Sequence, residues 1–206
     1  MSLRQLFVTQ VYDATLVAGA DFAGFNAELE AACRMLAAED AAGRAWCRRE
    51  GFGGYTSYAS LDDLPQRATV FAQLRTRLDR HAGAFAKALE LDLGGRRLKL
   101  DSLWVNILKP GGAHSGHIHP HSVLSGTVYV AVPKGAGALK LEDPRLGLMM
   151  AAPPRRADAA EAGRSFVYLT PEAGAVLMWE SWLRHEVAPN RARAERISLS
   201  FNYGWR

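Results

Sequence analysis

Cysteine is scarce in this sequence. The chain of 206 residues contains two cysteines, Cys33 and Cys47, which are too few for the disulfide framework of a small secreted domain. Cys33 lies in a helical pattern, where a small buried apolar residue is the ordinary interpretation. Isolated thiols are typical of a reducing compartment, so we expect a cytoplasmic protein.

Long apolar runs are also missing. No stretch approaches the roughly 20 apolar residues that a membrane-spanning helix requires. The first residues, MSLRQLFVTQVYD, lack the continuous apolar segment and small-residue cleavage site of a secretory signal. We therefore expect a protein that is neither exported nor embedded in a membrane.

Basic residues are numerous but scattered. Lys and Arg number 25 against 21 Asp and Glu, which gives a formal net charge of +4. The basic residues form only short pairs such as Arg48–Arg49, whereas a nucleic-acid-binding protein concentrates them on one face. No nucleic-acid partner is predicted. The excess of positive charge is only a weak indication of acidic ligands or partners.

The first part of the chain, residues 1–95, has helical character. A strand is expected within residues 6–16, followed by a helix from Asp21 to about residue 38 whose apolar residues recur every three or four positions. Pro65 is expected in the first turn of a second helix. His81, on the apolar stripe of that helix, is interpreted as a packed side chain.

After Gly94 and Gly95 the pattern changes to short apolar runs separated by Gly and Pro, which indicates an antiparallel sandwich or barrel. We predict a fold that is mainly β with flanking helices, a single domain over residues 1–206. In it, residues 96–206 form the β core and the helices cover one sheet, leaving the interior for a site. The expected strands are residues 99–108, 118–119, 123–132, 138–141, 165–169, 175–179, 185–187 and 196–203, with a loop at 150–163.

Four of the six histidines fall within eight residues: His114, His117, His119 and His121. In an extended segment, residues two apart project from the same face. His117 and His119 would then point into one cavity, which favours a metal site. The alternative is a histidine-rich surface turn around Pro120.

A third ligand and an anion-binding group occur farther along. His185 starts another extended piece, and three ligands from two distant strands would leave open positions on a metal ion. Arg196 lies on the last expected strand, with Ser198 on the same face. A guanidinium is always charged and offers a two-pronged donor, so an inward Arg196 calls for a carboxylate.

Several short motifs follow one another in a recognisable order: His117-x-His119-Pro120, Leu124-Ser125-Gly126-x-x-Tyr129, Glu142-Asp143-Pro144-Arg145, His185-Glu186-Val187-x-Pro189 and Arg196-x-Ser198. Together they resemble the iron(II)/2-oxoglutarate-dependent dioxygenase superfamily, and in particular a bacterial group of oxygenases marked by H-x-H-P, L-S-G-x-x-Y and E-D-P-R. The motifs cover residues 104–203, and the Gly53-Gly54-Tyr55-x-Ser57 stretch is also similar.

The resemblance implies a double-stranded β-helix, or jelly roll, with Fe(II) inside and 2-oxoglutarate as cosubstrate. The expected reaction is a hydroxylase-type oxidation of an unidentified small molecule or peptide, coupled to decarboxylation of 2-oxoglutarate to succinate. His117 and His185 match the family's histidine ligands. Arg196, Ser198 and Tyr129 match residues around the far carboxylate of 2-oxoglutarate, and Asn106 is a further candidate for binding the cosubstrate. For the oligomeric state we consider a homodimer.

His119 departs from the superfamily pattern, which usually has Asp or Glu at this position. With His117, His119 and His185 as ligands, the site would be one unit more positive. Asp143 is a candidate carboxylate ligand in place of His119. Glu186 should point away from His185, because neighbouring residues of a strand face opposite sides. The position of Glu180 in the sequence does not indicate a ligand. We expect His121 beside the site or facing substrate, and His114 in a loop.

Two other functions remain open at this point. One is a cupin-like metalloenzyme that uses the three histidines without 2-oxoglutarate. The other is a non-catalytic β-sandwich that keeps a metal for stability. Trp179 and Trp182 are expected to pack around His185 or to wall the pocket. The pocket wall is expected from residues 51–60, the loop after Met150 and His121.

Overall fold

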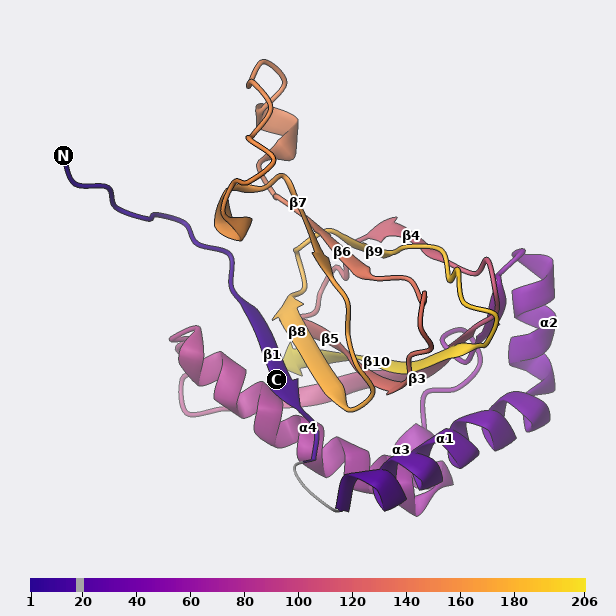
Figure 1. Ribbon diagram of the computed structural model, residues 1–206. Helices are drawn as coiled ribbons and strands as arrows, with labels where there is room; N and C mark the ends of the chain where they lie inside the picture. Colours follow the sequence, from indigo (N-terminus) through magenta and orange to yellow (C-terminus); the bar gives the residue numbers. More distant parts are fainter. Residues whose placement is uncertain (18–20) are drawn as a thin grey trace.

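The computed structural model describes residues 1–17 and 21–206 (Figure 1). The helices are α1 (Asp21–Glu39), α2 (Ala41–Arg49), α3 (Leu64–Arg67) and α4 (Thr69–Ala88), with the short 3-10 helices η1 (Leu146–Leu148) and η2 (Glu161–Gly163). The strands are β1 (Val11–Thr15), β2 (Gly54–Thr56), β3 (Leu98–Leu108), β4 (His114–His117), β5 (Leu124–Ala131), β6 (Leu139–Glu142), β7 (Phe166–Leu169), β8 (Ala175–Glu180), β9 (His185–Val187) and β10 (Arg196–Trp205).

Two antiparallel sheets form the β structure. The major sheet has six strands in the order β1-β8-β5-β10-β3-β2, and the minor sheet has four in the order β4-β9-β6-β7. The sheets face each other across an interior, and the helices lie outside the major sheet (Figure 1). This is a double-stranded β-helix with N-terminal helices on one sheet, so the predicted fold class is confirmed.

Strand β10 has an apolar face and a polar face. Alternate residues of β10 point to opposite faces. Its apolar residues belong to the hydrophobic core that the helices cover, namely Ile197, Leu199, Phe201 and Tyr203. Its polar residues face the interior between the sheets: Arg196, Ser198 and Asn202 are buried there, and the Ser200 hydroxyl bonds to the side chains of Asn106 and Thr127. The main core therefore lies on the outer face of the major sheet, and the polar positions converge inside.

Helices α1 and α4 provide the other half of that core. Their stripes are at the expected spacing, and Leu29, Leu74 and Leu78 have no exposed surface. His81 on α4 bonds to the Tyr12 hydroxyl through Nδ1 at 2.9 Å, which confirms its interpretation as a packed side chain. Each fully buried leucine contributes about 1.5–3 kcal/mol to folding.

A glycine in the L-S-G motif allows the strands of the major sheet to pack tightly. A Cβ atom at Gly126 would lie 2.5 Å from the Phe201 ring and 2.6 Å from the Leu177 carbonyl oxygen. Because neither neighbour is the free end of a flexible chain, a larger residue would push β5, β8 and β10 apart. The motif is thus a packing requirement of the sheet that carries the site.

The structure differs from the expected elements in several places, and it adds two short strands, β2 and β4, that were not predicted. Helix α2 was not predicted; it begins directly after Asp40, whose Oδ1 accepts a hydrogen bond of 2.8 Å from the Gly43 amide. Strand β1 covers only the second half of the expected residues 6–16. Residues 118–119 are not a strand, since β4 ends at His117 before Pro120. None of the helices in residues 1–17 and 21–206 combines the length and the apolar composition of a membrane span.

Candidate active site

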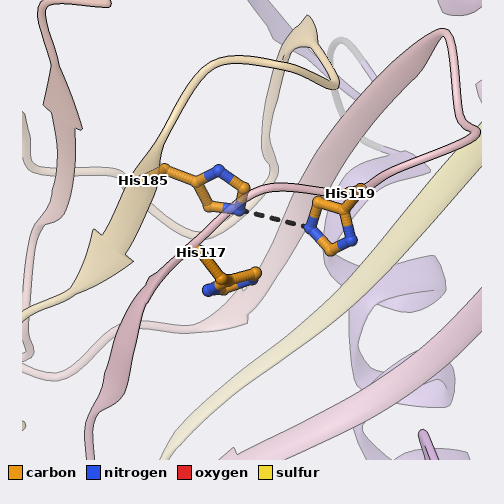
Figure 2. Close-up of side chains that lie close together, drawn as sticks. All are labelled: His117, His119 and His185. Atoms are coloured by element: carbon orange, nitrogen blue, oxygen red, sulfur yellow. Dashed lines mark hydrogen bonds between the residues drawn. The ribbon is translucent and has the colours of Figure 1, made fainter.

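Three histidines meet inside the β structure. The ligand atoms of His117, His119 and His185 all lie within 4.8 Å of one another (Figure 2). His117 ends β4 and is paired in register with His185, which begins β9. His119 follows the strand, and its backbone amide donates to the Ser181 carbonyl at 3.0 Å. The three predicted metal-binding side chains are therefore brought together from two distant parts of the chain.

Backbone carbonyls set the orientation of two of the rings. Nδ1 of His117 lies 2.7 Å from the Ser115 carbonyl oxygen, and Nδ1 of His185 lies 2.9 Å from that of Leu183. A carbonyl oxygen can only accept, so both Nδ1 atoms carry the proton. Each Nε2 atom is then left with its lone pair free for a metal, which is the usual arrangement around metal-bound histidines.

The separation of the remaining nitrogens suits one ion. Nε2 of His119 and Nε2 of His185 are 3.3 Å apart (Figure 2). Two nitrogens at right angles around one ion are about 3 Å apart when each lies roughly 2.1 Å from it. Burial lowers the pKa of His119 to about 4 and that of His185 to about 3. Both rings are neutral at pH 7, the form that binds metals.

Arg196 lies fully buried inside, with two of its nitrogens unused. Nη1 donates to the Ser198 hydroxyl at 3.3 Å, while Nε and Nη2 have no hydrogen-bond partner within residues 1–17 and 21–206. Its guanidinium carbon is 4.9 Å from the centre of the Tyr129 ring, and the Tyr129 hydroxyl is also buried and unpaired. Among the described residues no carboxylate pairs with Arg196. Unmet donors around a buried cation indicate a site for an anionic ligand.

The other polar side chains of the interior mostly satisfy one another. The Ser125 hydroxyl bonds to the Ser181 hydroxyl at 2.7 Å and to Oδ1 of Asn202 at 2.8 Å. Nδ2 of Asn106 donates to the Ser200 hydroxyl at 3.1 Å, but its Oδ1 has no partner. Ser125 is satisfied, whereas Arg196, Tyr129 and Asn106, three of the predicted cosubstrate residues, have polar atoms without a partner among the described residues, as do His114 and Trp179.

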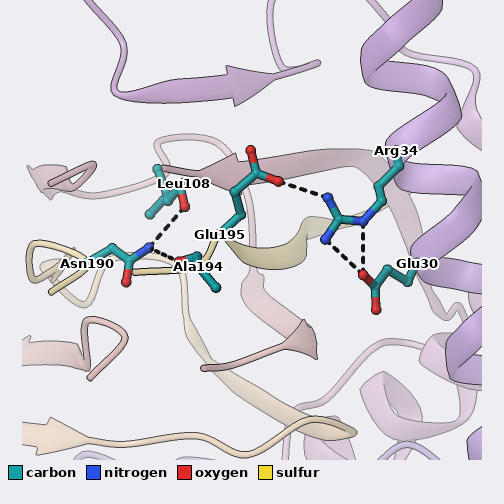
Figure 3. Close-up of polar contacts among 6 residues, drawn as sticks. All are labelled: Glu30, Arg34, Leu108, Asn190, Ala194 and Glu195. Carbon is teal, nitrogen blue, oxygen red and sulfur yellow. Dashed lines mark hydrogen bonds and ion pairs between the residues drawn. The ribbon is translucent and has the colours of Figure 1, made fainter. Parts of the chain in front are cut away.

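The turn before β10 holds Arg196 in place. The buried side chain of Asn190 donates to the Leu108 carbonyl at 3.1 Å and to the Ala194 carbonyl at 2.9 Å (Figure 3). Glu195, directly before Arg196, accepts a hydrogen bond of 2.8 Å from Arg34 on α1 (Figure 3). Both ends of the turn are therefore tied to other elements.

A cavity of about 300 Å³ opens onto the histidines. Aromatic side chains dominate its wall, and none of the described Asp, Glu, Lys or Arg residues lines it. Its lining residues are Trp46, Phe52, Thr56, Tyr58, Trp104, Asn106, His114, His117, Ile118, His119, Pro120 and Asn202. Residues 51–60 contribute as predicted, whereas the loop after Met150 and His121 do not line it. The alternation along β10 could have identified Asn202, but no local pattern singles out Trp46.

The acidic candidates lie outside the histidine cluster. Asp143 accepts from Nε and Nη2 of Arg145, both at 3.0 Å, and caps the turn at Pro144. Glu186 forms an ion pair of 2.9 Å with Lys140, away from the interior as expected. The ligand group that the described residues form contains neither of them, nor Glu180. Asp143 is therefore corrected from candidate ligand to turn residue.

The other tryptophans and histidines considered as site residues lie in different surroundings. Trp179 packs against His185, with ring centres 4.6 Å apart, while Trp182 is 46% exposed. His121 is exposed and has a left-handed backbone with φ of 69°, so it does not face the cavity. His114, expected in a loop, is the first residue of β4 and lines the cavity, which corrects that expectation.

Comparison with known proteins identifies one matching family model. Residues 102–202 match the model described as "Putative 2OG-Fe(II) oxygenase". No curated protein sequence matches the chain.

Solved structures resemble the chain over nearly its whole length. A Pseudomonas putida prolyl-4-hydroxylase is 20% identical, with a TM-score of 0.63 over 96% of this chain and 94% of that one. The epimerase SnoN from nogalamycin biosynthesis, in complex with Fe3+, alpha ketoglutarate and nogalamycin RO, is 18% identical, with a TM-score of 0.63 over 95% of this chain and 79% of that one. HygX from Streptomyces hygroscopicus, with nickel and 2-oxoglutarate bound, is 16% identical, with a TM-score of 0.61 over 96% and 83%. At these identities the likeness shows the fold.

Proposed function

The chain belongs to the 2OG-Fe(II) oxygenase family, and from this premise we propose that it oxidises a small molecule or peptide with dioxygen and 2-oxoglutarate. The observation that carries the proposal is the pairing of three convergent histidines with a buried guanidinium whose donors are unmet. Imidazole nitrogens suit iron, and a buried arginine suits a dicarboxylate. The solved complexes of SnoN and HygX hold a metal ion and the same 2-oxo acid in this fold.

The residues present fit both groups. His117, His119 and His185 would hold Fe(II), and Arg196 would bind the far carboxylate of 2-oxoglutarate, with Ser198, Tyr129 and Asn106 around it. When bound, Fe(II) and 2-oxoglutarate supply the chemistry: one oxygen atom of dioxygen enters succinate as carbon dioxide leaves, and the other enters a C–H bond of the substrate. The metal supplies the oxidation chemistry, and the protein supplies binding and orientation.

The chain's own contribution is orientation and charge. The Ser115 and Leu183 carbonyls fix the proton on Nδ1 of two ligands and direct Nε2 inward. Three neutral imidazoles leave the full charge of the ion in place, and Arg196 adds a further positive charge. This surplus favours a doubly charged 2-oxo acid. The aromatic wall of the cavity keeps the substrate side apolar and limits water near the reacting atoms.

An anaerobic titration tests the proposal. The Fe(II)-loaded protein is titrated with 2-oxoglutarate, and the visible charge-transfer band of a chelated 2-oxo acid is followed. We expect the band in the wild type, and in Arg196→Gln a loss of 2-oxoglutarate affinity of about 100-fold with Fe(II) affinity retained. Absence of the band in the wild type would instead support the cupin-like alternative, as would oxygen consumption without succinate in a separate aerobic assay.

We also propose a cytoplasmic location. Cys33 and Cys47 are both buried and free, as expected of a protein that works in a reducing compartment.

A further inference from the structure

A β-bulge turns His114 into the interior. On β4 and β9, His114 lies opposite Val187 and His117 lies opposite His185, with a shift of register between the two pairs. In a regular strand, residues three positions apart point to opposite faces. The bulge adds one residue to β4 and places both His114 and His117 on the cavity side. Bulges next to active sites commonly re-aim a side chain in this way.

The ring of His114 is held in place, yet it has an unused polar atom. Its ring lies edge-on to Phe52, with centres 5.2 Å apart. Its Nε2 atom is buried and has no hydrogen-bond partner in the part of the chain that the structure describes. Burial, followed by the nearby charges of Arg196 and His117, lowers the pKa of His114 to about 4. The ring is therefore neutral at pH 7, and it shares the cavity wall with His117 and His119.

We propose that His114 is a cosubstrate-binding residue that donates a hydrogen bond from Nε2 to the carboxylate of 2-oxoglutarate held by Arg196. This inference rests on the function proposed above. An ionised carboxylate has about four lone-pair sites, more than Arg196 alone can fill with its two free nitrogens. A neutral histidine adds a donor without adding another positive charge next to the guanidinium.

A role as a fourth metal ligand is a different assignment that the geometry does not support. The ligand group formed by the described residues consists of His117, His119 and His185, and His114 is not within it. Hydrogen bonding within the described residues does not account for the orientation of the ring, because its buried Nε2 has no partner among them. A ligand carboxylate removes the unmet hydrogen bond.

The test uses the Fe(II)-loaded full chain under anaerobic conditions. The dissociation constant of 2-oxoglutarate is measured from the charge-transfer band, and that of Fe(II) is measured by competition with a chelator. The variants are His114→Leu, which removes the donor; His114→Gln, whose amide nitrogen can occupy the position of Nε2; and His121→Asn. His121 is an exposed histidine with a left-handed backbone that asparagine tolerates, so the third variant is the matched control.

We expect His114→Leu to weaken 2-oxoglutarate binding by about 10- to 100-fold, as a lost hydrogen bond to a charged group does. His114→Gln should recover most of the loss, and Fe(II) affinity should stay unchanged in all variants. The inference fails if His114→Leu binds 2-oxoglutarate within about threefold of the wild type, if His114→Gln is as weak as His114→Leu, or if Fe(II) affinity falls in parallel. If the wild type gives no band, the proposed function fails first and this inference fails with it.

Discussion

At the scale of single residues, His119 is the position that distinguishes this site. Its Nε2 lies 3.3 Å from that of His185, and its ring packs near Trp104, with centres 5.9 Å apart. A carboxylate here would cancel one unit of the metal's charge, whereas imidazole cancels none. The described residues provide no substitute carboxylate in the cluster. The charge at the metal is therefore set by three neutral ligands.

A pair of substitutions at His119 tests whether it is a ligand. We expect His119→Asp to keep Fe(II) binding, because a carboxylate oxygen replaces the nitrogen. His119→Ala should lose more than about 100-fold in Fe(II) affinity, since even the loss of an outer partner costs 10- to 100-fold. Chelator competition under anaerobic conditions gives both values. Unchanged affinity in His119→Ala would show that two histidines suffice.

At the scale of elements, Asp40 joins α2 to the segment that lines the cavity. Its Oδ1 caps α2 through the Gly43 amide. Its Oδ2 accepts from the Tyr55 hydroxyl at 2.8 Å and from the Ser60 hydroxyl at 2.6 Å. Helix α2 carries Trp46 to the cavity, and the segment carries Phe52 and Tyr58. One carboxylate thus holds two parts of the cavity wall together.

Removal of this carboxylate should lower the stability of the protein. We expect Asp40→Ala to decrease the free energy of unfolding by about 2–4 kcal/mol, from the lost cap and two lost hydrogen bonds to a charged acceptor. Asp40→Asn should lose less, because its amide oxygen can still cap the helix. Urea denaturation measures both. The neighbouring Glu39→Ala is the control and should stay within about 0.5 kcal/mol; an equal loss there would contradict the assignment.

The same elements show what a sequence can predict. Arg196 and Ser198 were predictable on one face because β10 alternates regularly, and the stripe of α1 was predictable from its spacing. The inward orientation of His114 was not predictable, because the bulge in β4 breaks the alternation of the strand. The bulge depends on pairing with β9, which the sequence does not reveal. Helix α2 follows α1 after a single residue, Asp40, and a glycine inside it weakens the helical pattern. The capping residue Asp40 was the one sequence signal for the start of α2.

At the scale of the whole molecule, metal binding should stabilise the fold. A metal that binds only the folded state adds about 2.7 kcal/mol at a free concentration 100 times its dissociation constant. For a chain of this size this corresponds to an increase in Tm of about 5–10 °C. Thermal unfolding with and without Fe(II), anaerobically, measures the shift. His117→Ala should abolish it and His121→Asn should keep it; a shift of full size in His117→Ala would place the metal elsewhere.

The outer face of the major sheet packs against the helices, whereas its inner face carries polar side chains beside a smaller apolar cluster that includes Tyr129, Leu177 and Trp179. On β10, Ile197, Leu199 and Phe201 belong to the main core, while Arg196, Ser198 and Asn202 belong to neither apolar cluster. Exchange of these polar positions therefore changes the chemistry of the interior while the apolar core on the other face stays in place. A fold divided in this way can diversify its chemistry one strand position at a time.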